Sequence, residues 1–117
     1  MTVNIDITKE LKAVEKLIKS DINKEKTILG LYNYIFKSDG KKIRSRLNLI
    51  ASSSSKNSHR YKLASIIELL HTATLVHDDV VDNASTRRGA VSVNSLWSNA
   101  HGVLIGDYIY SKAFMLM

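Results

Sequence analysis

The chain contains no proline, and its apolar residues recur at helical spacing along most of its length. Proline and glycine are the residues that most often interrupt helices, and only five glycines occur among the 117 residues. No segment shows the alternation of apolar and polar residues that is typical of half-buried strands. The pattern therefore predicts an all-α fold in which helices are joined by polar connectors.

The spacing of apolar residues predicts helices near the N-terminus, where Leu11, Val14 and Ile18 share one face, then at 27–36, 42–51 and 61–81, and from about 93 onward. The serine-rich stretch 52–58 and the polar stretch 83–92 are predicted to be loops. Gly102 and Gly106 would allow either a close helix contact or a break in the last segment.

The length of the chain suits one small domain that spans residues 1–117. Residues 114–117 are Phe-Met-Leu-Met and lie within an apolar helical pattern that has no stop signal. Natural domains rarely end in this way. We therefore expect the domain to be truncated at its C-terminus and to be part of a larger protein.

Composition excludes several classes of site. Without cysteine the chain has no disulfide and no thiolate metal site. The net charge is +6, but the basic, aromatic-interleaved strands of many nucleic-acid binders are missing, so no nucleic-acid partner is expected. No signal peptide and no apolar run long enough to cross a bilayer is evident, and a cytoplasmic protein without a transmembrane segment is expected.

Three aspartates, Asp78, Asp79 and Asp82, stand in the spacing DDxxD near the end of the predicted helix 61–81. At about 100° per residue, Asp78 and Asp82 are about 40° apart around the helix, whereas Asp79 is turned about 100° away from Asp78. His71, two turns earlier, lies on the side of Asp78. Asp78 and Asp82 can therefore face one metal ion, and hard oxygen ligands favour Mg²⁺ or Mn²⁺ over zinc.

A plainer interpretation of each residue stays open. An acidic helix end is common on solvated surfaces, although carboxylates there oppose the helix dipole, which a bound cation would offset. His71 and His77 taken singly are more often buried histidines with satisfied hydrogen bonds than ligands. The sequence around His77 offers it no evident partner.

Four basic residues accompany the aspartates. Arg87 and Arg88 follow one short loop later, and Gly89 lets the backbone come close to a ligand. Lys41 and Arg44 share one face at the start of the predicted helix 42–51. Guanidinium groups bind phosphate oxygens in a bidentate manner. Each basic pair alone is typical of surface charge, but together with the aspartates they indicate a site for a metal-bound diphosphate.

The combination of motifs resembles the trans-isoprenyl diphosphate synthase (polyprenyl synthetase) family. The matching segments are GKKIR at 40–44, IELLHTATLVHDDVVDNASTRRG at 67–89, VNSLW at 93–97 and GDYIYSKAF at 106–114. The chain is most similar to bacterial octaprenyl diphosphate synthases, from residue 40 to its end. The resemblance implies an antiparallel helical bundle of the isoprenoid synthase type, of which this chain is the N-terminal portion.

The resemblance also implies an activity. In this family the enzyme is a prenyltransferase that adds isopentenyl diphosphate to an allylic prenyl diphosphate with Mg²⁺. Matching the first aspartate-rich motif assigns Asp78 and Asp82 as Mg²⁺ ligands for the allylic diphosphate, with Asp79 in a supporting role. The family uses bulky residues ahead of this motif to stop chain growth. Ala73 and Thr74 are small, which argues against a short product.

The same matching implies roles for the other polar residues. Lys41, Arg44, His71 and Arg88 would hold isopentenyl diphosphate, and Arg87 would contact the allylic diphosphate. No organic cofactor is implied. The full-length protein is expected to be a homodimer.

A second aspartate-rich motif, which binds the opposing metal ions in the family, is missing from these 117 residues. Beyond Asp82 the only acidic residue is Asp107. We therefore expect no significant synthase activity from this chain alone. The alternative is a non-catalytic subunit or a diphosphate-binding module of a heteromeric prenyltransferase.

Overall fold

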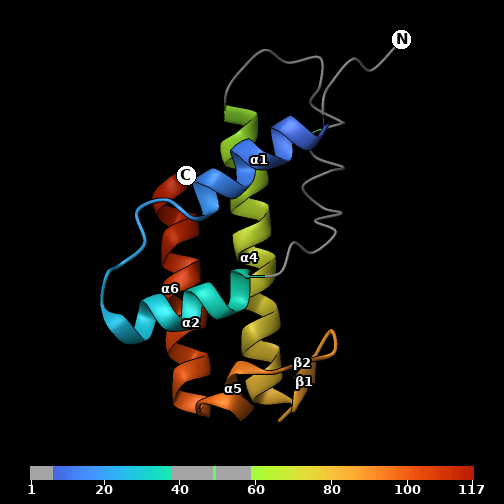
Figure 1. The fold of residues 1–117 in the computed structure, drawn as a ribbon, viewed down its shortest axis with the longest axis vertical. Coiled ribbons are helices and arrows are strands. Elements are labelled where there is room, and N and C mark those ends of the chain that lie inside the picture. The colour runs from blue at the N-terminus through green and yellow to red at the C-terminus, as the bar shows by residue number, and fades with distance from the viewer. Residues whose placement is uncertain (1–6, 38–48, 50–58) are drawn as a thin grey trace.

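The computed structural model describes residues 7–37, 49 and 59–117. Its elements follow the order α1 (Ile7–Ile18), α2 (Lys26–Phe36), α4 (His59–Val81), β1 (Thr86–Arg87), β2 (Ala90–Val91), α5 (Val93–Leu96) and α6 (Asn99–Leu116) (Figure 1). The predicted all-α class is confirmed. Apart from Leu49, the predicted helix 42–51 and the predicted loop 52–58 lie outside the described residues.

The long helices α4 and α6 lie side by side and antiparallel, and α1 and α2 lie across them (Figure 1). The described helices each contribute apolar side chains to one core, whose fully buried members include Val14, Leu31, Leu69, Ala73, Ile105 and Ile109. Burial of such side chains is the main term that holds helices together. Among the described helices, none combines the length and apolar character needed to cross a membrane.

Two glycines let α6 come close to α4. A Cβ atom placed on Gly102 would lie 2.6 Å from Val80 Cγ2, and one placed on Gly106 would lie 2.1 Å from His77 Nε2. Both distances are far below van der Waals contact, so the helix separation depends on the missing side chains. Of the two possibilities predicted for these glycines, the structure shows the close contact, not the break.

The predicted continuous helix from residue 93 is wrong at one point, because the chain breaks between α5 and α6. Ser98 has extended backbone, and its Oγ accepts a hydrogen bond from the His101 backbone N–H at 3.2 Å. A serine that accepts from the third residue of a helix is a strong helix start. Apolar residues continue across this point, so periodicity alone does not reveal the break.

The predicted loop 83–92 contains a β-hairpin, which corrects the expectation of a strand-free chain. β1 and β2 pair antiparallel, with Thr86 opposite Val91 and Arg87 opposite Ala90. The two turn residues both have positive φ, 52° at Arg88 and 80° at Gly89. Such a pair is typical of a type I′ turn, whose twist suits a tight hairpin.

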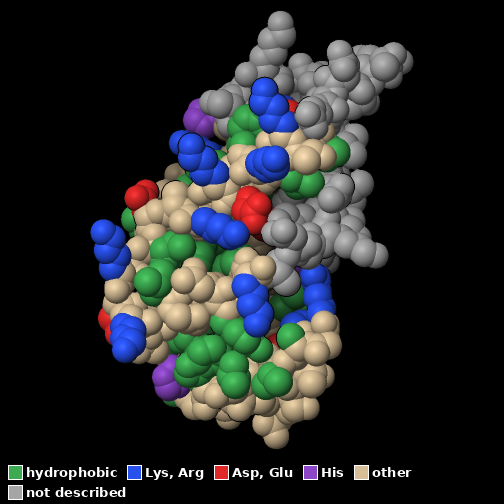
Figure 2. Space-filling model, viewed as in Figure 1, with side chains coloured by type: hydrophobic (Ala, Val, Ile, Leu, Met, Phe, Trp, Pro, Cys, Tyr) green, Lys and Arg blue, Asp and Glu red, His purple; other side chains and the backbone are tan. Residues whose placement is uncertain are grey.

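The hairpin and α5 also contact α2. Tyr34 donates from its hydroxyl to the Val91 carbonyl at 2.6 Å, and its ring lies 5.1 Å from that of Trp97, edge to face. Leu96 and Trp97 stay partly exposed. Figure 2 shows hydrophobic side chains gathered on the surface where α2 and α5 meet, with Lys and Arg side chains scattered over the same face. The hairpin is thus supported from α2 as well as from α4.

Buried polar contacts join α1 to the other helices. Arg60 on α4 forms an ion pair with Glu10 on α1, and only 9% and 10% of the two side chains are exposed. At the other end of α1, Tyr32 donates to the Ile18 carbonyl and Lys112 donates to the Ser20 carbonyl. Burial raises the pKa of the Tyr32 hydroxyl and lowers that of the Lys112 ammonium.

Candidate functional site

Asp78 and Asp79 lie in the last turn of α4, and Asp82 follows directly after it. The helix ends there in a Schellman motif. Asn83 adopts a left-handed conformation with φ of 53°, and its N–H donates to the Val80 carbonyl at 3.3 Å. The next residue, Ala84, donates to the Asp79 carbonyl at 2.9 Å. These two hydrogen bonds are the signature of this helix ending, and asparagine tolerates the left-handed position better than most residues. The chain therefore turns away immediately after Asp82.

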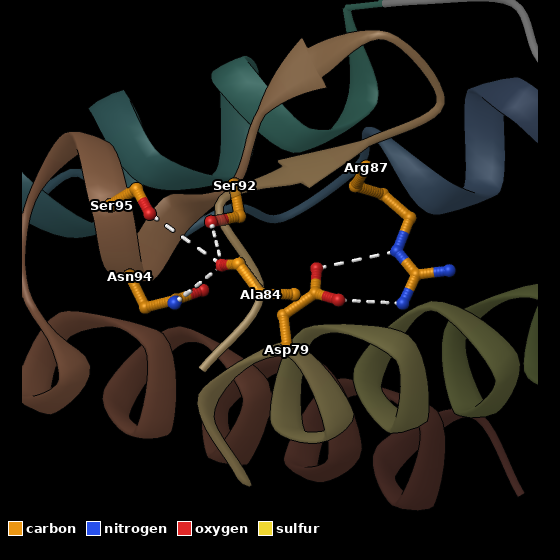
Figure 3. Close-up of polar contacts among 6 residues, drawn as sticks. All are labelled: Asp79, Ala84, Arg87, Ser92, Asn94 and Ser95. Atoms are coloured by element: carbon orange, nitrogen blue, oxygen red, sulfur yellow. Dashed lines mark hydrogen bonds and ion pairs between the residues drawn. The ribbon is translucent and has the colours of Figure 1, made fainter. Parts of the chain in front are cut away.

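Asp79 is buried and paired with Arg87 from the hairpin. Its Oδ1 lies 2.6 Å from Arg87 Nη2, and its Oδ2 accepts from Arg87 Nε at 3.3 Å (Figure 3). The Asp79 side chain is only 7% exposed. The hydrogen bonds to Asp79 raise the pKa of the Arg87 guanidinium above its ordinary value, with burial acting in the opposite direction. Asp79 thus binds the hairpin to the end of the aspartate helix.

Asp78 and Asp82 are exposed, in contrast to Asp79. They lie one turn apart, and the Asp82 N–H donates to the Asp78 carbonyl at 2.8 Å. The sides of the helix predicted from periodicity therefore match the observed burial. Within the described residues, no three His, Asp or Glu side chains are grouped so that they could hold a metal ion. Two carboxylates nevertheless suit Mg²⁺, which usually keeps several waters and is shared with phosphate oxygens.

A second set of contacts holds the segment between the aspartates and the hairpin. The Ala84 carbonyl accepts from Ser92 Oγ at 2.7 Å, from Asn94 Nδ2 at 2.9 Å and from Ser95 Oγ at the long distance of 3.5 Å (Figure 3). The Ser92 N–H in turn donates to the Ser85 carbonyl at 3.0 Å. The three side chains at 92–95 were not among the predicted site residues. Their cluster of small polar residues next to the RRG segment is the signal that could have indicated them.

The structure describes only some of the remaining predicted site residues. Lys41 and Arg44 lie outside the described residues. Arg88 is exposed at the hairpin tip in the left-handed conformation, which is unusual for a residue with a long side chain. His71 is half-buried on α4, two turns before Asp78. Among the described residues, the structure therefore brings the three aspartates and both arginines to one end of α4.

His77 has partners that the sequence did not reveal. Its Nε2 lies 3.3 Å from the Val103 carbonyl and 3.3 Å from Asp107 Oδ1, and its ring lies 5.4 Å from that of Tyr110. All three partners belong to α6. His77 is therefore a contact between helices α4 and α6, although its side chain is 27% exposed and not buried as the plainer interpretation expected.

The two small residues ahead of the aspartates differ in position. Ala73 is fully buried in the core, whereas Thr74 is exposed and its hydroxyl lies 2.9 Å from the Tyr110 hydroxyl. Only Thr74 therefore lies on the exposed side of α4 that carries Asp78 and Asp82.

Comparison with known proteins identifies relatives of this chain. The family model described as Polyprenyl synthetase matches residues 25–117. The octaprenyl diphosphate synthase of Escherichia coli is 36% identical over 119 residues, which cover 98% of this chain and 36% of that protein.

Two solved structures share the fold. A decaprenyl diphosphate synthase from Rhodobacter capsulatus superimposes with a TM-score of 0.87 and 36% identity, over 95% of this chain and 35% of that one. A polyprenyl synthase from Caulobacter crescentus, complexed with calcium and isoprenyl diphosphate, gives a TM-score of 0.84 and 35% identity, over 94% of this chain and 34% of that one.

The chain spans between 27% and 36% of the length of three curated relatives that it matches. The match to the Escherichia coli protein covers nearly the whole of this chain. The part matched by the family model includes the three aspartates and the arginines of the hairpin. The chain belongs to the polyprenyl synthetase family.

Proposed function

We propose that this chain forms one wall of a prenyl diphosphate synthase site and binds the diphosphate of an allylic prenyl substrate together with Mg²⁺. The observation that supports it most directly is the Asp79–Arg87 pair, which joins the aspartate helix to the arginine hairpin. As a result, two exposed carboxylates and two guanidinium groups lie at one end of α4. Carboxylates alone would repel a diphosphate, and arginines alone would not hold a divalent cation.

Asp78 and Asp82 are the residues that would hold Mg²⁺. When bound, the ion neutralises negative charge on the departing diphosphate and so stabilises the transition state. Arg87 has donors beyond the two that Asp79 engages, because a guanidinium carries five N–H groups in a fixed fork. Its side chain is 41% exposed, so these donors are accessible to a phosphate oxygen.

The second substrate would be isopentenyl diphosphate. We assign Arg88 to it, together with His71, Lys41 and Arg44, on the basis of the family motifs. The exposed position of Arg88 at the hairpin tip supports this assignment, because its side chain is free of the Asp79 contact that engages Arg87. The reaction would form a bond between the double bond of isopentenyl diphosphate and the allylic carbon of the other substrate. The allylic carbon–oxygen bond would break to release inorganic diphosphate, and the loss of a proton would restore a double bond.

The binding step can be tested by isothermal titration calorimetry with inorganic diphosphate in the presence and absence of Mg²⁺. We expect Mg²⁺-dependent binding, and Asp82→Asn should weaken it by about tenfold or more, a loss in the range seen when a metal site is disturbed. Asp21→Asn is the matched control: it removes the same charge from an exposed residue of the α1–α2 connector, and asparagine tolerates its φ of 50°. Equal affinities for Asp82→Asn and Asp21→Asn would contradict the proposal.

Catalysis requires more than this wall. The sequence offers no second aspartate-rich motif to hold the opposing metal ions. We therefore expect no elongated product when the chain is incubated with Mg²⁺, farnesyl diphosphate and labelled isopentenyl diphosphate. Chain elongation by the purified 117-residue protein would show that the missing motif is dispensable.

The alternative proposal is a diphosphate-binding subunit that works with another chain. It is supported by the outward face of α6, where Val103, Leu104, Phe114 and Met115 are between 44% and 85% exposed. An apolar face of this kind is typical of a protein–protein contact. The same face of α6 could equally form the contact between subunits in the homodimer that we propose for the full-length protein. Elongation that appears only after a chain with a second DDxxD motif is added would favour the subunit.

A further inference from the structure

Asn94 joins the two halves of the proposed site without belonging to either. It lies in the short helix α5, and its Nδ2 donates to the Ala84 carbonyl at 2.9 Å. Ala84 is two residues beyond Asp82, and its own N–H donates to the Asp79 carbonyl. Ala84 is therefore held on both sides, by the aspartate helix through its N–H and by α5 through its carbonyl, as Figure 3 shows for the carbonyl.

The segment that Asn94 holds is the one that determines where Arg87 lies relative to the aspartates. From Ala84 the chain runs through only two further residues before Arg87. The Arg87 guanidinium must reach Asp79 while its remaining donors stay available to a ligand. A small displacement of Ala84 would change the geometry of both interactions, because so few residues separate them.

The second observation is that Asn94 is poorly suited to a purely stabilising role. Its Oδ1 is buried, and no donor among the described residues meets it. A buried acceptor without a donor destabilises the folded state. The Ala84 carbonyl would in addition remain satisfied without Asn94, because Ser92 Oγ donates to it at the shorter distance of 2.7 Å. An apolar residue of similar size should therefore preserve folding.

From these contacts we infer that Asn94 is a positioning residue, which sets the Arg87 hairpin at a defined place relative to Asp78 and Asp82. This inference rests on the proposed function, because Arg87 needs a defined position only if it binds a diphosphate. The position of Arg87 itself can be measured without any ligand, through the hydrogen bond between Arg87 Nε and Asp79.

The test compares Asn94→Leu with Lys112→Met. Lys112 lies near the C-terminal end of α6 and donates to the Ser20 carbonyl, so losing this hydrogen bond should destabilise the protein. The hairpin lies by the other end of α6, so the variant leaves the site untouched (Figure 1). For Asn94→Leu we expect a melting temperature within a few degrees of the parent, a shifted Arg87 Nε–Hε NMR signal, and about tenfold weaker Mg²⁺-dependent binding of inorganic diphosphate. That loss corresponds to about 1.4 kcal/mol. Lys112→Met should lower the melting temperature and leave the other two measurements unchanged.

The outcomes separate the two proposals. An unchanged Arg87 Nε–Hε signal in Asn94→Leu would overturn the positioning role, whether or not diphosphate binds. The role is equally overturned if both variants shift the signal, since the shift would then follow stability. A shifted signal in Asn94→Leu alone, in a parent protein that binds no diphosphate, supports the positioning role and rejects the proposed function.

Discussion

Replacing Glu10 by alanine is expected to lower the free energy of unfolding by about 3–5 kcal/mol, the usual effect of removing one partner from a buried ion pair. Arg60 would keep its contact with the Leu49 carbonyl at 2.7 Å but would lose the ion pair with Glu10. The loss is large because that ion pair offsets the cost of burying the guanidinium in the protein interior. Urea denaturation followed by far-UV circular dichroism would measure it.

Two further variants show whether the loss comes from breaking the buried ion pair. Glu10→Leu combined with Arg60→Leu removes both charges, and we expect this pair of changes to cost less than Glu10→Ala alone. Glu15→Ala breaks the exposed pair with Lys19, at 2.9 Å, and should cost less than about 0.5 kcal/mol. A double variant that is less stable than the single one would contradict the explanation.

Replacing both Gly102 and Gly106 by alanine is expected to destabilise the protein by about 4 kcal/mol. Within a helix, alanine is favoured over glycine by about 1 kcal/mol per residue, so the intrinsic preference alone predicts stabilisation. The new methyl groups would however lie 2.6 Å from Val80 Cγ2 and 2.1 Å from His77 Nε2. Overpacking of this severity costs about 3 kcal/mol per site, which outweighs the intrinsic gain.

Gly30 provides the matched control because it lies in α2, where a Cβ atom placed on it would meet no atom within 4 Å. Gly30→Ala should therefore raise the free energy of unfolding by up to about 1 kcal/mol. Every one of these substitutions adds one methyl group to a helical glycine. A higher free energy of unfolding for Gly30→Ala and a lower one for the variant at Gly102 and Gly106 would therefore isolate the close packing of α4 and α6 as the cause. If all three glycines responded alike, that packing would not limit the helix separation.

Long helices were predictable from this sequence because their apolar spacing is repeated over several turns. The predicted segments 27–36 and 61–81 differ from α2 and α4 by no more than two residues at either end. The break before α6 was not predicted, because it depends on one local hydrogen bond at Ser98 while the apolar pattern continues. The hairpin was missed because strands of two residues are too short to alternate visibly, and arginine is uncommon in a type I′ turn.

For the site, helix periodicity alone separated Asp79 from Asp78 and Asp82, and the observed burial agrees. The partner of Asp79 was not predictable. Arg87 reaches Asp79 from the first strand of the hairpin, and this contact depends on the turn at Asn83, which periodicity does not describe. The roles of Asp78, Asp82 and Arg88 stay predictions, as do those of Lys41 and Arg44, which lie outside the described residues.

The hairpin has a consequence for how such chains can vary. In a strand, successive side chains point to opposite faces, so inserting or deleting one residue between Ala84 and Arg87 would turn the guanidinium away from Asp79. Exchanging one residue there for another leaves the direction of Arg87 unchanged. The connector between the aspartates and the arginines should therefore accept changes of residue type far more readily than any change in its length.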